Sequence, residues 1–349
     1  MIVPIEITQP QKKSYKIHID KLPQLEFDNH VAIVTNPTVA KYHLKSVVAK
    51  ITAPKLEIIE VPDGEEYKSI ETILFILDKL FMAKFDRKST LIALGGGVIG
   101  DMTGFAASIY QRGVDFIQMP TTLLAQVDAS VGGKTGVNNR YGKNLIGAFY
   151  QPKAVYIDPK FLETLPKREF AAGVAEAIKM AVMFDREFFD FIQKSDLGES
   201  KNRIELIARS VKLKAKVVNQ DEKESGIRAV LNYGHTFGHV IENLTNYNQY
   251  LHGEAVAIGM VMANELAIEL NLLSRNEADL IKALLKRNNL PTSFAIDSIE
   301  DFYEHFYLDK KSSNGNIAFI LPNGRIGTHK ILKDIPKELV LKVLEKFRA

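Results

Sequence analysis

The alternation of short apolar segments with helical patterns in the first half of the chain constrains its fold more than any other feature. Each apolar segment is rich in β-branched residues and ends at Gly, Pro, Asn or Asp, as buried strands that lead into loops do. Between the second and third segments, "YKSIETILFILDKLFMAKF" carries apolar residues at helical spacing. This alternation predicts a mainly parallel sheet with helices on its faces. The expected strands are "HVAIVTN", "KLEIIEVP", "STLIALGGG", "VDFIQMP" and "KAVYIDP".

The pattern changes after about Pro166, where long helical segments follow one another. Only "NIAFILPNGRIGTHKI" near the end indicates a hairpin, turned at Pro322-Asn323-Gly324. We therefore expect an α/β domain over residues 1–164 and a mostly α-helical domain over residues 165–349. The expected helical segments are "REFAAGVAEAIKMAVMF", "NRIELIARSVKLKAKVV", "LNYGHTFGHVIENLT" and "HGEAVAIGMVMANELAIELNLL".

The charge balance and the absence of cysteine exclude several classes of partner and site. Forty-five Lys and Arg against forty-two Asp and Glu leave a net charge of +3, without a block of five like charges, so neither nucleic acid nor a membrane surface is an expected partner. Without cysteine, a metal site has to use histidine and carboxylate ligands. The N-terminus lacks a secretory signal pattern, and no apolar run reaches about 18 residues, so we expect a cytoplasmic protein.

The stretch "DASVGGKTGVN" at residues 128–138 is similar to the end of a nucleotide-binding P-loop, which needs G-x-x-x-x-G-K-[ST]. The first position of that motif is Asp128 here, and its carboxylate would repel the phosphates that the loop binds. The stretch is therefore not a P-loop, and Lys134 must have another role.

A second glycine-rich stretch, "LIALGGGVIGDMTGFAAS", follows an expected strand and opens a helix. Its Gly95, Gly97 and Gly100 satisfy G-x-G-x-x-G, in which glycines let the backbone approach a pyrophosphate, although a tight strand-to-helix turn also requires glycine. The motif begins some 95 residues into the chain, and no acidic residue ends a following strand about 20 residues on. A dinucleotide-binding domain is therefore expected to be Rossmann-like but not a standard Rossmann fold.

Two charged residues stand out on an otherwise apolar helix. Glu176 and Lys179 are the only charged residues between Phe170 and Phe184. Because an uncompensated buried ion costs several kcal/mol, both must meet partners or line a cavity. A simple Glu–Lys pair at i, i+3 is the structural alternative to a functional role.

Three histidines form a further candidate site. His235 and His239 lie four residues apart, on one face of a helix, and His252 opens the next helix. The zinc-protease motif H-E-x-x-H would require Glu where this chain has Thr236, so that function is excluded. Two or three histidines with the isolated Glu176 nevertheless match the His₂Glu ligand set of a catalytic zinc, against the alternative of histidines packed in the core.

Taken together, these stretches resemble the 3-dehydroquinate synthase family of sugar phosphate cyclases. The resemblance runs over nearly 250 residues, from about "DGEEYKS" to "DKK", and implies an N-terminal NAD domain, a helical metal and substrate domain, and an active site between them. Its most specific motifs are "GGGVIGD", "RGVDFIQMPTTLLAQVDASVGGKTGVN", "KNLIGAFYQP", "AEAIKMA", "DEKESGIRAVLNYGHTFGHVIE" and "HGEAVAIGM".

The resemblance implies four groups of site residues. Zn²⁺ or Co²⁺ would be bound by Glu176, His235 and His252. Proton handling would fall to His239, with Glu224 as a second candidate, and the other catalytic residues would be Lys179, Arg228 and Asn232. Substrate would be bound by Arg112, Asp128, Lys134, Asn144, Lys214 and either Lys310 or Lys311. NAD would be bound by Asp63, Gly64, Glu65, Lys68, Gly96, Gly97, Val98, Gly100, Asp101, Thr121, Thr122, Lys143, Phe161, Leu162, Glu163 and Thr164.

The reaction that the resemblance implies converts 3-deoxy-D-arabino-heptulosonate 7-phosphate to 3-dehydroquinate and phosphate in the shikimate pathway. NAD would oxidise the C5 hydroxyl, which acidifies the neighbouring C–H and permits elimination of phosphate; NADH would then reduce the ketone before ring opening and an internal aldol closure. The metal would act as a Lewis acid at the C5 oxygen. Lys134 and Asn144 would together hold the phosphate that is released. The resemblance also leads us to expect a homodimer.

Three alternatives share part of this pattern. An NAD-dependent polyol dehydrogenase such as glycerol dehydrogenase has the same fold and metal site but does not need the phosphate-binding set Arg112, Lys134 and Asn144. Another sugar phosphate cyclase, such as 2-deoxy-scyllo-inosose synthase, is nearer still. A catalytically silent nucleotide sensor would keep the glycines but would not require Glu176, Lys179 and the histidines together.

Overall fold

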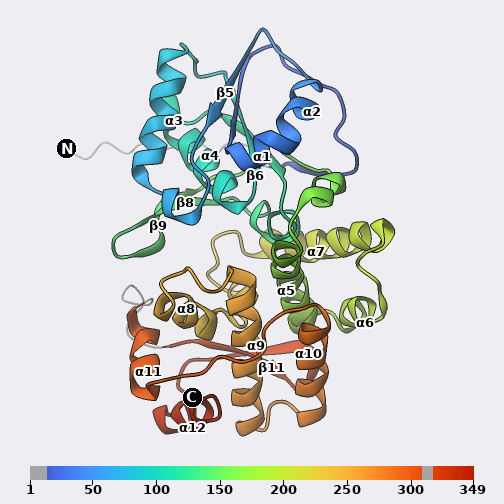
Figure 1. Cartoon of the computed structure of the whole chain (residues 1–349), viewed down its shortest axis with the longest axis vertical. Coiled ribbons are helices and arrows are strands. Elements are labelled where there is room, and N and C mark those ends of the chain that lie inside the picture. Colours follow the sequence, from blue (N-terminus) through green and yellow to red (C-terminus); the bar gives the residue numbers. More distant parts are fainter. Residues whose placement is uncertain (1–13, 309–316) are drawn as a thin grey trace, which may run out of the picture.

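The computed structural model describes residues 14–308 and 317–349, and the upper part of the molecule in Figure 1 is built on a six-stranded, all-parallel sheet. Its strand order is β1-β10-β7-β6-β3-β5. Small two-stranded sheets pair β2 with β4, β8 with β9 and β11 with β12. The strands are β1 (Lys16–Ile19), β2 (Leu25–Glu26), β3 (His30–Thr35), β4 (Ile51–Thr52), β5 (Lys55–Glu60), β6 (Thr90–Gly95), β7 (Asp115–Pro120), β8 (Lys134–Asn139), β9 (Gly142–Phe149), β10 (Ala154–Ile157), β11 (Phe319–Asn323) and β12 (Arg325–Leu332).

Helices cover both faces of the large sheet and form most of the lower part of the molecule. The α-helices are α1 (Pro37–Val39), α2 (Lys45–Val48), α3 (Ile70–Met82), α4 (Gly97–Ile109), α5 (Lys167–Phe184), α6 (Arg186–Lys194), α7 (Ser200–Gln220), α8 (His235–Leu244), α9 (His252–Glu269), α10 (Arg275–Arg287), α11 (Ile299–Leu308) and α12 (Lys337–Glu345). Shorter helical turns are η1 (Ala40–Leu44), η2 (Glu65–Tyr67), η3 (Tyr110–Arg112), η4 (Ala125–Ala129), η5 (Pro159–Thr164) and η6 (Ile227–Asn232).

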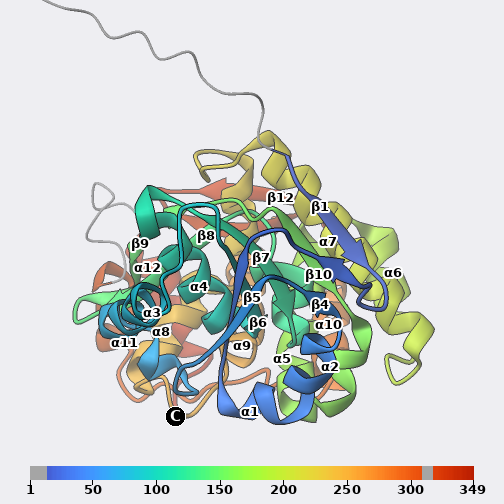
Figure 2. The same ribbon diagram turned by 90° about the horizontal axis from the view of Figure 1, so that it is seen from above.

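The large sheet is buried on both faces, which is why its strands are almost continuously apolar. Ala32 and Val34 of β3 pack with α3 and α4, whereas Val31 and Ile33 of the same strand pack in a separate cluster with Val47 of α2. Figure 2 shows α3 and α4 on one side of the sheet and α1 and α2 on the other. The two core layers thus follow from side chains that alternate along each strand.

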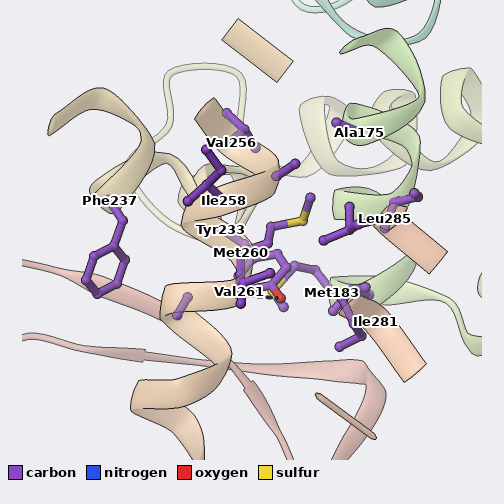
Figure 3. Close-up of a cluster of buried hydrophobic side chains, with 14 of the residues drawn as sticks. Ala175, Met183, Tyr233, Phe237, Val256, Ile258, Met260, Val261, Ile281 and Leu285 are labelled. Atoms are coloured by element: carbon purple, nitrogen blue, oxygen red, sulfur yellow. Dashed lines mark hydrogen bonds between the residues drawn. The ribbon is translucent and has the colours of Figure 1, made fainter. Parts of the chain in front are cut away.

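The helical part is organised around α9, which is buried along nearly its whole length. A helix that is apolar on all sides must be surrounded by other elements, and α9 contacts α5, α8, α10, α12 and β11. Figure 3 shows the centre of this core, with side chains from α5, α8, α9 and α10 around Tyr233. No helix in the described part of the chain is long and apolar enough to cross a membrane.

The structure confirms the predicted α/β part, the five expected strands, the helical second part and the C-terminal hairpin, which turns at Gly324 with φ of +81°. Strands β1, β2, β4, β8 and β9 were not expected from the sequence. Strand β1 forms the edge of the sheet beside β10, and the stretch after Gly133 forms the β8–β9 hairpin. Hairpin β8–β9 packs on α4, where a Cβ on Gly104 would lie only 2.5 Å from Thr135.

Candidate active site

Three potential metal ligands from three helices meet in the helical part. Glu176 lies in the middle of α5, and His235 and His252 are the first residues of α8 and α9. The Nε2 atoms of His235 and His252 are 3.9 and 3.7 Å from Oε1 of Glu176, and one donor atom from each of the three residues lies within 4.8 Å of the others. Two ligand atoms of one tetrahedral zinc ion are about 3.4 Å apart, a few tenths of an ångström less than the glutamate-to-histidine distances here. The glutamate-to-histidine distances therefore suit a single ion.

Glycines next to both histidines allow these helices to approach closely. A Cβ on Gly253 would lie 2.1 Å from the carbonyl oxygen of Ala172, one turn before the glutamate ligand. A Cβ on Gly259 would lie 2.0 Å from the carbonyl oxygen of Gly234, the residue before the first histidine ligand. Gly234 also has φ of +80°, which favours glycine. Any side chain at Gly253 or Gly259 would force the helices, and hence the ligands, apart.

The surroundings of the three ligands favour a cation between them. Both carboxylate oxygens of Glu176 are buried and accept no hydrogen bond from the described residues, although Lys179 Nζ forms an ion pair with Oε2. Burial, together with the charge of Lys179, holds the pKa of His235 well below its usual value, so its ring is in the neutral, metal-binding form. His235 Nδ1 lies 3.2 Å from the carbonyl oxygen of Tyr233, and a hydrogen bond there leaves Nε2 for a metal. The donor set thus fits a catalytic zinc or cobalt ion.

Asp128 connects this donor set to a cluster of cations. Its carboxylate, on η4, forms ion pairs with Lys214 of α7 and with Lys179, whose Nζ is 3.8 Å from Oδ2. Lys214 Nζ also donates to the backbone carbonyl of Asp128 at 2.6 Å. Burial alone would raise the pKa of Asp128, but the two lysines hold it well below its usual range. Lys179 therefore contacts Glu176 on one side and Asp128 on the other.

The other expected catalytic and substrate residues adjoin this cluster. Arg228 is buried on η6, and Asn232 at the end of the same turn donates to Oε1 of Glu224 at 2.5 Å. Lys134, the first residue of β8, forms an ion pair with the same glutamate. Although the Lys134 side chain is half exposed, partial desolvation of its ammonium group and the positive charges of Arg228 and Lys214 lower the pKa of Lys134 to about 8. These cations, brought together from both halves of the chain, would favour an anionic substrate.

The expected dinucleotide residues gather at the carboxyl edge of the large sheet. The strand order reverses between β3 and β6, and ligands of open parallel sheets bind at such a point. Asp63, just after β5, accepts hydrogen bonds from Asn36 at 2.8 Å and from Thr38 at 2.6 Å. Gly96 is the N-cap of α4, and a Cβ there would lie 3.0 Å from Cγ2 of Thr122. The N-terminus of α4, which directly follows β6, thus lies at this edge of the sheet without a side chain on its N-cap residue.

The remaining expected dinucleotide residues lie in turns and helix starts that follow strands of the same sheet, except Lys143, which is on β9 and pairs with Glu242. Lys68 is buried, and its Nζ donates to Oδ2 of Asp101 at 2.6 Å. Thr164 Oγ1, at the end of η5, is 2.9 Å from Nε2 of His43. The other residues of these turns and helix starts are Gly64, Glu65, Gly97, Val98, Gly100, Thr121, Phe161, Leu162 and Glu163.

Several expected residues have neighbours that the sequence did not indicate. Asn144 lies near the tip of the β8–β9 hairpin and accepts a hydrogen bond from Lys68 at 2.5 Å, whereas Lys134 pairs with Phe149 at the base, so the structure does not bring Asn144 and Lys134 together. Arg112 is exposed on η3, and no hydrogen bond or ion pair between described residues connects it to the cluster. Lys310 and Lys311 lie outside the described residues. The substrate-binding roles of these residues stay predictions.

Two residues at the site were missed by the sequence analysis. Asn36 directly follows β3 and binds Asp63, and its position at the end of a predicted strand was the signal that could have identified it. Glu242 lies three residues after His239, and its carboxylate contacts both Lys143 and His252. The short distance in sequence between this acidic residue and the histidines was the signal that could have identified Glu242.

Comparisons with known proteins identify the family of the chain. Family models described as 3-dehydroquinate synthase N-terminal and C-terminal match residues 58–172 and 173–312. A 3-dehydroquinate synthase from Sulfurovum sp. (strain NBC37-1) is 70% identical over 347 residues, which cover 99% of each chain. The solved structure of 2-epi-5-epi-valiolone synthase from Streptomyces hygroscopicus subsp. jinggangensis 5008, with NAD⁺ and Zn²⁺ bound, has a TM-score of 0.88 and 25% identity, covering 98% of this chain and 99% of that one. A 2-deoxy-scyllo-inosose synthase complexed with carbaglucose-6-phosphate, NAD⁺ and Co²⁺ has a TM-score of 0.81 and 25% identity, covering 95% and 96%. On its sequence and its architecture, the chain belongs to the 3-dehydroquinate synthase family.

Proposed function

We propose that this chain is a phosphate-eliminating lyase that converts 3-deoxy-D-arabino-heptulosonate 7-phosphate to 3-dehydroquinate and phosphate. The observation that carries the proposal is the position of Lys179, which contacts both Glu176 and Asp128. It places a cluster of cations directly beside a metal donor set. A phosphate-bearing polyol could therefore be held by its charge while its hydroxyl group lies at the metal.

The cofactors in this proposal occupy the two sites described above. Glu176, His235 and His252 would hold Zn²⁺ or Co²⁺, and the crevice between β3 and β6 would hold NAD, as in the similar solved structures that contain both. When bound, the metal supplies Lewis acidity at the C5 oxygen and NAD accepts the hydride from C5.

The side chains of the chain itself bind and orient the substrate. Lys134 and Arg228 would face the phosphate, and Lys179 and Lys214 would hold the ring through the successive steps, so that no intermediate has to leave. His239, whose ring centre is 5.4 Å from that of His235, is the proposed proton-handling residue. Glu224, hydrogen-bonded to Asn232, is the second candidate.

The test is to incubate the purified protein with the heptulosonate phosphate, NAD and Zn²⁺ while phosphate and NADH are both measured. Phosphate should accumulate over many turnovers without a matching rise in NADH absorbance, because the hydride taken from C5 returns to C5. Stoichiometric NADH would indicate a polyol dehydrogenase instead. A protein that binds the substrate but releases no phosphate would refute the proposed reaction.

Three expectations stay predictions beside this proposal. They are the domain boundary after residue 164, the homodimer and the cytoplasmic location.

A further inference from the structure

A buried carboxylate lies behind the metal ligand His252, and the reaction proposed above gives it no role. Glu242 is on α8, and its side chain is 3% exposed. Both of its carboxylate oxygens are 3.3 Å from Nδ1 of His252, while Nε2 of the same ring is 3.7 Å from Oε1 of Glu176. The imidazole ring therefore lies between two carboxylates, one at each nitrogen.

This arrangement determines which nitrogen of His252 can bind a metal. A hydrogen bond from Nδ1–H to Glu242 leaves the lone pair on Nε2, which faces Glu176. The other histidine ligand, His235, is oriented by a neutral backbone carbonyl instead. A carboxylate partner both fixes the ring and makes it a more basic ligand, and losing such a partner typically weakens metal binding.

Lys143 reaches Glu242 from the other half of the molecule. It belongs to β9, and its Nζ is 3.0 Å from Oε1 of Glu242 and 4.1 Å from the ring centre of Tyr247. A carboxylate buried to this degree is costly unless it is paired. The contacts with Lys143 and His252 supply that pairing.

We propose that Glu242 is a positioning residue that orients His252 for the metal, and that Lys143 holds Glu242 in place. The inference rests on the proposed metal ligands Glu176, His235 and His252. It gives Lys143 a role in addition to the NAD contact that the family resemblance implies. It also connects the β8–β9 hairpin to the metal site through one ion pair and one hydrogen bond.

The test measures metal affinity directly, without turnover. Metal-free protein is titrated with Co²⁺, and the visible absorption of the bound ion gives Kd for the parent and for Glu242→Ala and Glu242→Gln. We expect Glu242→Ala to weaken binding about 10- to 100-fold. Glu242→Gln, which keeps the size and one acceptor for the imidazole N–H, should show a smaller loss and an altered spectrum.

The matched control is Glu265→Gln, which removes another ion-paired glutamate of the helical part, bound to Arg275 and Lys346 on its surface. It should leave the Co²⁺ affinity within about twofold of the parent, because coupling between sites falls off with distance. Circular dichroism verifies that each variant is folded. If Glu242→Ala does not fold, Glu242→Gln alone decides the question. Parent-like affinity and spectrum in Glu242→Gln would then overturn the inference, as would an equal loss in the control.

A further variant distinguishes failure of this inference from failure of the metal assignment. Glu176→Ala should abolish stoichiometric Co²⁺ binding, and if it does not, the ligand assignment itself is wrong. If it does, but both Glu242 variants bind Co²⁺ like the parent, only the positioning role is refuted.

The contribution of Lys143 is measured by a double-mutant cycle. Lys143→Met should weaken Co²⁺ binding in the parent but have much less effect in Glu242→Gln, because the two residues act through one contact. Equal effects of Lys143→Met in both backgrounds would refute the connection between the hairpin and the metal site.

Discussion

The close contact between α9 and α5 predicts that Gly253→Ala damages the metal site without touching a ligand. A Cβ at this position would lie 2.1 Å from the carbonyl oxygen of Ala172, whereas real Cβ atoms essentially never approach within 3.0 Å of a non-bonded heavy atom. Since backbone atoms of two packed helices cannot rotate away, the start of α9 has to move from α5 by about 1 Å. Such overpacking should destabilise the fold by about 1–3 kcal/mol.

The same displacement acts on the neighbouring ligand. His252 Nε2 is 3.7 Å from Oε1 of Glu176 in the structure, and a shift of about 1 Å away would take it far beyond the roughly 3.4 Å between two ligand atoms of a tetrahedral zinc ion. The histidine would then have to leave its rotamer or lose the ion. We therefore expect the affinity of Gly253→Ala for Zn²⁺ or Co²⁺ to fall about 10-fold or more.

The assay combines a Co²⁺ titration of the metal-free protein with a thermal melt of the same preparation. Gly198→Ala is the control, because a Cβ there would meet only the carboxylate of Asp196, at 3.0 Å, and that side chain can rotate. Gly253→Ala should lower both Tm and metal affinity, while the control should leave the metal affinity unchanged. A variant with parent-like Tm and Kd would refute the packing argument. A lower Tm with unchanged Kd would show that the helix contact does not position the ligand.

Three further predictions concern the substrate and the metal. Lys134→Ala should lower kcat/KM for the heptulosonate phosphate by about 10- to 150-fold, because a hydrogen bond to a charged group is worth roughly 1.5–3 kcal/mol, while Kd for NAD changes far less; the reverse result would overturn the placement of the phosphate at this lysine. With the pKa of Lys134 lowered to about 8, its charge is present below that pH and lost above it, so kcat/KM should fall as pH rises through 8. In Lys134→Arg this fall in kcat/KM should occur at higher pH, and the same pH dependence in both proteins would argue against Lys134 as its origin. Chelation should abolish turnover while circular dichroism keeps most of its amplitude, and cooperative unfolding on metal loss would instead indicate a structural ion.

The sequence alone determined most of the fold and the types of residue that form the site. Strand and helix positions follow from periodicities that are local, so the alternation before Pro166 and the long helices after it could be recognised without tertiary information. The metal ligands were indicated for a related reason. Glu176 stands isolated on an apolar helix, and the histidines are close in sequence. Such residues are costly or unusual wherever the chain places them, so their types are informative before any contact is known.

Only the tertiary structure decided which of these residues meet. Lys143 and Glu242 are 99 positions apart, and Lys134 and Glu224 are 90 positions apart, so neither pair leaves a local pattern. The antiparallel register of β8 and β9 separates Lys134 from Asn144, although both lie in stretches that resemble the same family. Contacts of this kind depend on how closely helices and hairpins pack. That packing depends here on glycines such as Gly253, which has no side chain to keep the two helices apart. The need for glycine at this position becomes apparent only when the opposing backbone is in place.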